Sequence, residues 1–477
     1  MGASLLATDG YKFSMAEAGW PLRQETFYYC HRRGGPQVVP LDVEPLVRAL
    51  LPRPLPEDYA YLAASGYEMG AGFRAAVLRG EQLRVRALPR GAVFLPREPV
   101  LSVTGPSVLV SWLEPLLLQL NFRIQVATGA LQEREGLARA LGRVTCEAQR
   151  QVVLETLDAV GVAPFPITVD EEGYYRRVRA TVRELVESVG DPARIFEVGL
   201  RAATCLEQHL VALRACRDEG VVRTSHVLGA RMLGLVPVGT MGHEHVQRYG
   251  ADEPAFRAMR ERRPQRSSYL LDTYDTLALG LPAALRLIAE DPAAGDSIRF
   301  DSGHKGLQYL YAVVRSREQG LSPVYILEDG LDAAATRELE GLRQQAGVPP
   351  AVQFYGYGGH IVARPMDSPL TRDRVAAVYK LSQTGPVATM KFGDEAAEGK
   401  QSIPGRPIVF RRQAGRGPLG LVGQEGEEPP EGYVLLTGAP ERPPLLAELS
   451  AAQEGPTVGY TPATRALVEA LRPRVPR

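Results

Sequence analysis

Between residues 194 and 362 short apolar segments alternate with helical stretches, and this alternation constrains the fold more than any other feature of the chain. Strands that alternate with helices at this spacing predict βαβ units and a parallel sheet. Seven such units favour an irregular TIM-like βα barrel over an open sheet. The predicted strands are Ile195–Gly199, Val221–Ser225, Val236–Thr240, Tyr269–Asp272, Ile298–Asp301, Val324–Leu327 and Val352–Tyr355. The predicted helices between them are Ala202–Cys216, Leu228–Leu233, Thr276–Ala289, Lys305–Arg317 and Ala333–Ala346.

The segments on either side of this region have a different pattern of predicted helices and strands. We therefore expect an α/β protein of three parts. Residues 1–130 predict an α+β domain, residues 131–362 the barrel, and residues 363–477 a small β-rich domain that packs with the first. In the first part we expect strands at Glu25–Tyr29 and Val93–Leu95, helices at Val43–Leu51 and Glu57–Ala64, and one long buried helix over Val108–Val126. Leu131 to Leu185 is helix-rich with a loop at Gly161–Phe165, and the last part has strands in VYKLS and PIVFRR and a loop at Gly415–Gly432.

Composition excludes several classes of protein. Of 477 residues 45% are hydrophobic, which is enough for a large core and excludes general disorder. Basic and acidic residues both number 55, so a chain-wide nucleic-acid or anionic-membrane footprint is not expected. The four cysteines have no CxxC spacing and suggest reduced thiols. The N-terminus lacks the pattern of a signal peptide, and Glu114 and Pro115 interrupt the most apolar stretch, so we expect a cytoplasmic protein without a membrane span.

Lysine is scarce, because only five of the 55 basic residues are lysines. They are either accidental survivors of an arginine-rich composition or positions where a compact ammonium group is needed. The five are Lys12, Lys305, Lys380, Lys391 and Lys400.

Polar residues are concentrated directly after the predicted strands. Five of the seven histidines lie there, together with carboxylates and glycines. Active sites of βα barrels form at the carboxyl ends of the strands, so these turns predict one polar site. The turns include Gly199-Leu200-Arg201, Ser225-His226, Gly239–His245, Asp272–Asp275, Asp301–Lys305, Glu328-Asp329-Gly330 and Gly356–His360.

Each turn also has a purely structural interpretation. Asp301 and Ser302 could cap a helix, Lys305 could lie on a solvated helix face, and Gly356–Gly359 could be a tight turn. Glycine-rich turns before helices also bind phosphate, although no GxxxxGK[ST] motif occurs. The His-Glu-His of residues 243–245 lacks the i, i+4 spacing of a zinc protease, and in an extended segment His243 and His245 would point the same way.

This set of residues suits a phosphorylated, polyhydroxylated substrate. Asp side chains bond sugar hydroxyls, and Arg201 and Arg299 offer planar forks for phosphate or carboxylate. A neutral imidazole can act as nucleophile or base.

The motifs resemble those of the nicotinate phosphoribosyltransferase family, the type II pyridine phosphoribosyltransferases. The matching segments cover most of the chain in the family's order: LLATDGYKFSM, FEVGLRAA, RTSHVLGARMLGLVPVGTMGHEH, LLDTYDT, RFDSGHKG and VYKLSQTGP…MKF…GKQSIPG. All five lysines lie inside these segments.

The resemblance implies formation of nicotinate mononucleotide and pyrophosphate from nicotinate and phosphoribosyl pyrophosphate, coupled to ATP hydrolysis through a phosphohistidine. It implies Mg²⁺ bound with the phosphorylated substrates, no resident metal ligands, a role in NAD biosynthesis, and a homodimer with shared active sites. His243 matches the phosphorylated histidine, and Tyr11 matches an aromatic residue that stacks on the pyridine from the neighbouring subunit. The remaining matches are Arg201 and Arg299 near the pyridine, ribose and phosphates, Ser225 and Thr240 in the substrate-binding segments, Asp301 and Asp329 at the ribose, and Gly358 and Gly359 at the 5′-phosphate.

The chain departs from the family pattern at four places. His226 replaces an asparagine, His304 an aspartate and Ala202 an arginine, while Gly359-His360 stands where the family has a threonine. These changes would add three histidines to one mouth of the barrel. Three other interpretations therefore stay open: a nicotinamide phosphoribosyltransferase, a catalytically weakened nucleotide-binding relative, and a metal-dependent barrel enzyme that uses His243, His245 and Asp301.

Overall fold

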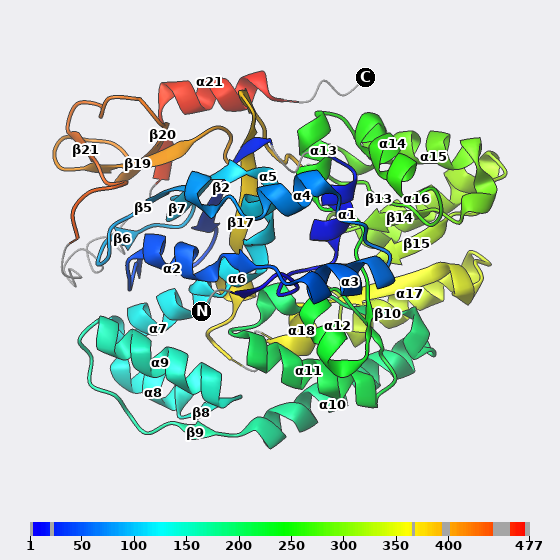
Figure 1. The fold of residues 1–477 in the computed structure, drawn as a ribbon, viewed down its shortest axis with the longest axis horizontal. Coiled ribbons are helices and arrows are strands. Elements are labelled where there is room, and N and C mark those ends of the chain that lie inside the picture. Colours follow the sequence, from blue (N-terminus) through cyan, green and yellow to red (C-terminus); the bar gives the residue numbers. More distant parts are fainter. Residues whose placement is uncertain (1–2, 20–22, 365–367, 394–400, 442–457, 473–477) are drawn as a thin grey trace.

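A seven-stranded parallel sheet is the largest sheet of the described residues, and its labelled strands β10, β13, β14 and β15 lie in the right-hand half of Figure 1. The computed structural model describes residues 3–19, 23–364, 368–393, 401–441 and 458–472. The strand order is β12-β11-β10-β16-β15-β14-β13, so the sheet confirms all seven predicted strands. Their bounds are β10 (Ile195–Glu197), β11 (Arg223–Thr224), β12 (Val236–Pro237), β13 (Ser268–Leu270), β14 (Ser297–Phe300), β15 (Val324–Leu327) and β16 (Gln353–Tyr357).

Amphipathic helices follow the strands where the sequence predicts them. In α17, for example, the Asp332 carboxylate caps the first turn by accepting from the Ala335 amide, and Leu339 is buried. The longest helix, α10 (Glu171–Val189), packs against α11 and α17. The bounds are α11 (Leu206–Asp218), α12 (Val227–Leu233), α15 (Leu281–Glu290) after the π turn η4 (Thr276–Gly280), α16 (Lys305–Glu318) and α17 (Ala333–Gln345).

The sheet does not close into a complete barrel. Within the described residues, β12 pairs only with β11 and β13 only with β14, so these two strands are its edges. After β12 the chain enters α13 (His243–Tyr249) and α14 (Asp252–Arg262). The N-terminal segment lies against the end of β12, where a Cβ on Gly239 would overlap the backbone of Gly10. The favoured closed barrel is therefore corrected to an open parallel sheet.

The first and last parts of the chain share a five-stranded sheet of order β18-β17-β2-β7-β5. Its strand β2 (Gln24–His31) pairs antiparallel with both β7 (Leu101–Pro106) and β17 (Ala377–Thr384). The edge strands are β5 (Arg84–Ala87) and β18 (Val387–Ala388). After the parallel sheet the chain thus returns, through β17, to the N-terminal strands. This pairing brings the residues near 10 and the residues near 390 to the same region. The boundaries at 130 and 362 stay predictions.

A four-stranded sheet of order β21-β19-β20-β22 follows. Its strands are β19 (Pro407–Arg412), β20 (Gly420–Gln424), β21 (Tyr433–Leu435) and β22 (Val458–Tyr460). The prediction of a loop throughout Gly415–Gly432 is wrong, because β20 lies inside it. A Cβ on Gly420 would overlap the buried carboxylate of Glu98, so close packing, and not loop flexibility, requires this glycine.

The predicted long helix over Val108–Val126 is also wrong. The chain forms α5 (Ser107–Trp112), α6 (Glu114–Leu118) and α7 (Leu120–Gln132). Pro115 stands in the first turn of α6, where its missing N–H is tolerated, but it cannot continue the hydrogen bonds of α5. The break leaves Glu114 buried at the start of α6 and available to the site.

The remaining elements agree with the expected helix-rich and α+β regions. The loop predicted at Gly161–Phe165 lies between α9 and β9, and no helix of the described residues is long and apolar enough to cross a membrane. These elements are β1 (Ala3–Ser4), α1 (Tyr11–Glu17), β3 (Gln37–Val38), α2 (Val43–Leu50), β4 (Pro52–Arg53), α3 (Pro56–Ala64), α4 (Ala71–Ala76), β6 (Val93–Phe94), α8 (Arg134–Leu141), β8 (Arg143–Val144), α9 (Glu147–Ala159), β9 (Thr168–Val169), α18 (Gly359–Val362), α19 (Arg372–Val375) and α21 (Pro462–Ala470).

Candidate active site

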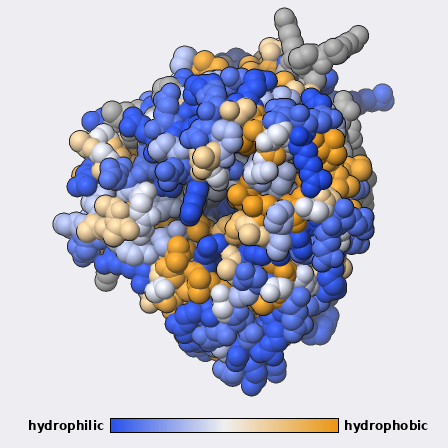
Figure 2. Space-filling view, turned by 90° about the vertical axis from the view of Figure 1, so that its right-hand side faces the viewer, coloured by the Kyte–Doolittle hydropathy of each residue, from blue (hydrophilic) through white to orange (hydrophobic). Residues whose placement is uncertain are grey.

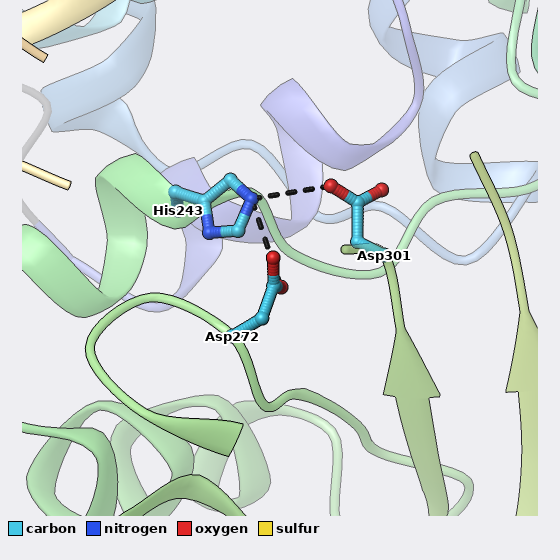
Figure 3. A group of neighbouring side chains, drawn as sticks. All are labelled: His243, Asp272 and Asp301. Carbon is cyan, nitrogen blue, oxygen red and sulfur yellow. Dashed lines mark hydrogen bonds and ion pairs between the residues drawn. The ribbon is translucent and has the colours of Figure 1, made fainter. Parts of the chain in front are cut away.

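His243 is the centre of one polar group at the carboxyl edge of the sheet (Figure 3). It is the first residue of α13, and its Nε2 lies 3.3 Å from Asp301 Oδ2 and 3.8 Å from Asp272 Oδ1. Its Nδ1 lies 3.1 Å from the Thr273 hydroxyl. The two carboxylates follow β13 and β14, so neighbouring parallel strands bring them to one point.

Lys391 completes this group from the segment that follows β18. Its Nζ is 2.8 Å from His243 Nε2 and 2.8 Å from Asp272 Oδ2. We call His243, Asp272, Thr273, Asp301 and Lys391 the His243 cluster. His243, Asp272 and Asp301 have the donor set of a metal site, with ligand atoms within 4.8 Å of one another. The Lys391 ammonium already bonds two of these three side chains, so it supplies the positive charge that a resident ion would bring.

The electrostatics of this cluster keep the imidazole neutral. Burial and the adjacent Lys391 charge lower the pKa of His243 to about 4. Burial opposes ionisation of Asp272, but Lys391 outweighs it and holds the pKa of that carboxyl below its usual value. When Lys391 donates to Nε2, the ring proton lies on Nδ1 and is donated to Thr273. His243 therefore presents an unprotonated nitrogen at neutral pH, as a nucleophile requires.

A second polar group lies at the ends of β10 and β11. Ser225 Oγ donates to Asp9 Oδ1 at 2.6 Å, and Arg201 Nε lies 3.5 Å from Asp9 Oδ2. The Tyr11 hydroxyl donates to Glu114 Oε2 at 2.5 Å, and the Arg201 guanidinium carbon lies 5.6 Å from the centre of the Tyr11 ring. We call Asp9, Tyr11, Glu114, Arg201 and Ser225 the Tyr11 cluster. It combines an aromatic face with a cation, as recognition of an aromatic acid requires.

Lys12 anchors the Tyr11 cluster in the core. Its Nζ is 2.6 Å from both Glu114 Oε2 and Glu244 Oε1, and all three side chains are buried. Lys12 and Arg201 hold the pKa of Glu114 well below its usual value, although burial opposes this. Because Glu244 adjoins His243 in α13, this ion pair also ties α1 to the helix that carries the histidine.

Tyr11 contacts the strand-end segments of its own chain, and a contribution to the site of a neighbouring subunit stays a prediction. The amide of Gly10 donates to the Ser225 carbonyl at 2.7 Å, and the amide of Val227 donates to the Thr8 carbonyl at 3.1 Å. A Cβ on Gly242 would lie 3.1 Å from Tyr11 Cε2. The N-terminal segment is thus bound along the β11–α12 connection, and Tyr11 lies beside the turn that leads into His243.

Arg299 and Thr240 connect the inner strand β14 with the turn after the edge strand β12. Arg299, on β14, donates to the Thr240 hydroxyl after β12, and its Nε lies 3.7 Å from Glu328 Oε2. The predicted residues Arg299, Thr240 and Asp301 therefore lie at one end of the sheet. Glu328 extends this group from the end of β15.

The predicted glycine turn lies beside the Arg201 loop. Gly358 precedes α18, and a Cβ on Gly359 would lie 3.7 Å from that of Ala202. A Cβ on Gly358 would lie 3.2 Å from the Val198 carbonyl oxygen, so the turn runs close to the end of β10. Asp329 follows β15 with a φ of 60°, a left-handed conformation that Asp tolerates better than most residues. Both features lie at the edge that carries the two clusters.

The other histidines do not gather at one mouth. His245 is buried and its Nε2 lies 2.8 Å from the Ala255 carbonyl, because residues 243–249 are helical and not extended. His226 is buried against His209, with their Nδ1 atoms 2.9 Å apart. His304 caps α16 and is exposed, and His360 lies on α18. A metal centre of His243, His245 and Asp301 is thus not formed.

Sequence reasoning missed several residues of the site. Asp272 stands in a strand-end turn and Lys391 is one of the rare lysines, so both carried a usable signal. Lys12 is also one of the rare lysines, whereas Glu114 carried no such signal, because only the fold brings α6 to the ends of β10 and β11. Of the other lysines, Lys380 lies on β17, where burial lowers its pKa to about 7 although Glu114 partly offsets this. Lys400 lies outside the described residues.

Known proteins resemble this chain over most of its length. No protein-family model matches the sequence. A nicotinate phosphoribosyltransferase of Mycobacterium tuberculosis is 26% identical over 446 residues, which cover 90% of this chain and 81% of the relative. That of Bacillus subtilis is 28% identical over 246 residues, which cover 50% of this chain and 47% of the relative.

Solved structures share the fold. The nicotinate phosphoribosyltransferase of Porphyromonas gingivalis superposes with a TM-score of 0.58 at 19% identity, covering 84% of this chain and 95% of that one. The enzyme of Vibrio cholerae gives a TM-score of 0.57 at 17% identity, covering 98% and 96%. The fold, the polar edge and the relatives define an α/β enzyme of the phosphoribosyltransferase class. Within that class, the curated relatives and the solved structures that this chain resembles are nicotinate phosphoribosyltransferases.

Proposed function

We propose that this protein transfers the phosphoribosyl group of phosphoribosyl pyrophosphate to nicotinate and couples this step to ATP hydrolysis through His243, in NAD biosynthesis. The pyridine nitrogen bonds to C1′ of the ribose, and the bond from C1′ to the pyrophosphate oxygen breaks. The observation that carries the proposal is that the aromatic–arginine pair of the Tyr11 cluster and the neutral His243 lie at one edge of one sheet, joined through the turn at Gly242.

The Tyr11 cluster would bind the pyridine. The Tyr11 ring offers a stacking face, and Arg201 offers a guanidinium for the nicotinate carboxylate. Asp9 and Glu114 hold Arg201 from the other side, so the guanidinium is positioned before substrate arrives. A carboxylate substrate would bring one negative charge toward this arginine.

The opposite side of the edge would bind the sugar and the phosphates. Asp301 and Asp329 can accept hydrogen bonds from ribose hydroxyls, and negative charge at Asp301 stabilises an oxocarbenium-like centre. The Gly358–Gly359 turn offers backbone amides to the 5′-phosphate, and Arg299 offers a guanidinium to the phosphates.

His243 would accept a phosphoryl group from ATP. With Nδ1 bonded to Thr273, Nε2 is the nitrogen that forms the bond to phosphorus, while ADP leaves with the electron pair of the broken P–O bond. Lys391 would have to release Nε2 before the phosphoryl group bonds there, and it could then pair with the new phosphoryl oxygens.

Mg²⁺ would enter with the substrates. The Asp301 side chain is 29% exposed, so hard carboxylate oxygen is accessible beside the proposed phosphate groups. The ion supplies neutralisation of charge on the departing pyrophosphate. We also propose a homodimer with shared active sites.

The test is product formation from phosphoribosyl pyrophosphate and Mg²⁺ with nicotinate or nicotinamide, each with and without ATP. We expect nicotinate mononucleotide, in an amount that rises with ATP. Preference for nicotinamide would instead assign Asp9 Oδ2, which has no hydrogen-bond partner among the described residues, to a carboxamide. No product from either base would overturn the proposal.

A further inference from the structure

A cavity lies directly behind the His243 cluster. Its volume is about 420 Å³, and it is enclosed by α13, α14, η4, α15 and the segment from β18 to Phe392. This volume falls within the range of small-molecule sites. Figure 2 faces the side of the molecule that carries α14 and α15 in Figure 1, and shows apolar patches between hydrophilic side chains there. The residues that matter below are Gln247, Asp252, Tyr274, Ala283, Met390 and Phe392.

The cavity is lined by the Asp252 carboxyl group, one oxygen of which has no hydrogen-bond partner among the described residues. Asp252 is 5% exposed, and its Oδ1 has no hydrogen-bond partner among the described residues. The other charged side chains that line the cavity, Arg286 and Glu253, bond each other at 2.8 Å. Burial, with Asp272 and Asp275 adding to it, raises the pKa of Asp252 to about 7. Near neutral pH this carboxyl can donate as an acid or accept as a carboxylate.

The walls of the cavity are the reverse sides of the segments that build the His243 cluster. Asp272 and Thr273 face His243, whereas Tyr274 lines the cavity. Lys391 bonds His243, whereas its neighbours Met390 and Phe392 line the cavity. The two segments are tied together, because the Phe392 amide donates to the Thr273 carbonyl at 3.2 Å.

The helix α13 belongs to both sites as well. His243 starts this helix at the cluster, and Gln247, one turn further on, lines the cavity. A molecule in the cavity would therefore press on all three elements that position His243, Asp272 and Lys391.

The lining defines the chemistry of an occupant. Tyr274, Phe392 and the Met390 thioether are partners for a flat ring. The Asp252 carboxyl requires a group that donates a hydrogen bond, and it disfavours carboxylates and phosphates by repulsion. We propose that the cavity binds a planar heteroaromatic amine or amide through Asp252, and that its occupancy shifts Lys391 and so changes turnover. The second half of this inference rests on the proposed function, whereas the first does not.

The binding test uses the full chain and two probes, adenosine and nicotinamide, in isothermal titration calorimetry. We expect at least one of them to bind at millimolar or lower concentration, with one site per chain that persists in saturating nicotinate. Asp252→Leu, and independently Ala283→Leu, which fills the cavity, should weaken binding at least tenfold, about 1.4 kcal/mol. Glu171→Leu is the matched control, because Glu171 is an exposed acid at the same first-turn position of α10, and it should bind like the wild type.

Two results would overturn the binding site. One is that neither probe binds the wild type. The other is that binding survives both cavity substitutions but is lost in Tyr11→Ala, which would place the probe in the Tyr11 cluster. Thermal melting of each variant identifies a substitution that unfolds the chain. If one of the two cavity variants, Asp252→Leu or Ala283→Leu, is unfolded, binding to the other one decides whether the cavity is the site.

The coupling test measures turnover with and without the probe that binds. The expected result is a change in kcat of twofold or more at unchanged KM for nicotinate, and no change in Asp252→Leu. An unchanged kcat with the cavity occupied would overturn the coupling. If the chain forms no product from either base, the calorimetric result still decides the binding site, so the two failures are distinguishable.

Discussion

The Tyr11 cluster and the His243 cluster lie on the same edge of one sheet but differ in their balance of charge. In the first, the carboxylates of Asp9 and Glu114 face the cations Arg201 and Lys12. In the second, Asp272 and Asp301 have only the ammonium of Lys391 beside them, because His243 is neutral at pH 7. Counted together with Lys12, which Glu244 shares, the Tyr11 cluster has one cation for each of its two carboxylates, whereas the His243 cluster carries an excess negative charge.

This difference separates a binding surface from a reactive one. A balanced and buried ion-pair network fixes its members in one geometry, which suits recognition of a rigid aromatic ring. A cluster with excess negative charge keeps an imidazole electron-rich and calls for a divalent cation when phosphates arrive. Both clusters are completed from outside the parallel sheet, the first by α1 and α6 and the second by the segment after β18.

Removal of the His243 imidazole should have the largest effect, because it takes away the reactive group of the His243 cluster. In His243→Ala we expect ATP stimulation to be abolished and the slow, ATP-independent transfer to remain, a loss of about 10² to 10⁴ in rate. Steady-state kinetics with and without ATP measure this, and phosphoamino-acid analysis should show no acid-labile phosphate. His304→Ala is the control, because His304 is an exposed helix cap. Persistent ATP stimulation in His243→Ala would refute the role of this histidine.

Lys391→Met should have the next largest effect and should depend on pH. Lys391 lowers the pKa of His243, so its removal raises that pKa from about 4 toward 6.5. A histidine that must be neutral then becomes protonated at higher pH, and the acidic limb of the kcat profile should move upward by about one unit or more.

The same substitution leaves the Asp272 carboxylate buried without its cation, which we expect to cost about 3–5 kcal/mol of unfolding free energy. A kcat profile from about pH 3 to 9, which includes the wild-type limb near the His243 pKa of about 4, and urea unfolding check both effects. Lys305→Met serves as the comparison, since Lys305 begins α16 and does not belong to the cluster. An unshifted acidic limb in Lys391→Met would show that Lys391 does not set the charge of His243.

Substitutions of Tyr11 test whether the Tyr11 cluster binds the pyridine base. Tyr11→Ala should weaken nicotinate binding by about tenfold through loss of the stacking face, with phosphoribosyl pyrophosphate binding unchanged. Tyr11→Phe keeps the ring and loses only the bond to Glu114, so its effect should be a few-fold. Calorimetry with each substrate measures both affinities. Equal loss of both substrates in Tyr11→Ala would mean that Tyr11 supports the fold of the edge and not the base site.

The parallel sheet was predictable because the sequence pattern of each strand and of the turn after it lies within a few neighbouring residues. Each strand is a short apolar run, and each turn after it is polar, so the seven strands and residues such as His243, Asp301 and Arg201 could be located from the sequence. The open edge was not predictable, because it depends on where the N-terminal segment packs, and that packing joins residues far apart in the sequence, such as Gly10 and Gly239.

The partners that complete the clusters were hidden for the same reason. Glu114 stands in an apolar stretch and interrupts it, and nothing in its neighbours indicates that α6 begins beside Arg201. Lys391 was noted for its rarity, but 119 residues separate it from Asp272. Contacts across such separations follow from topology, which a single sequence specifies only indirectly.

Lys380 gives the smallest expected effect and tests how far the two clusters interact. Burial lowers the pKa of Lys380 to about 7, Glu114 of the Tyr11 cluster raises it, and Lys391 of the His243 cluster lowers it. Between pH 7 and the unfolded value of 10.5, the unfolded chain binds a proton that the folded chain does not, so this lysine makes the free energy of unfolding rise with pH.

Lys380→Met should remove that rise. The difference in unfolding free energy between variant and wild type should therefore shrink from pH 7 to pH 9 in urea titrations. Lys380→Arg keeps its charge throughout and should be destabilised at both pH values. A difference that is constant with pH in Lys380→Met would place the titration of Lys380 outside this range and separate the two clusters electrostatically.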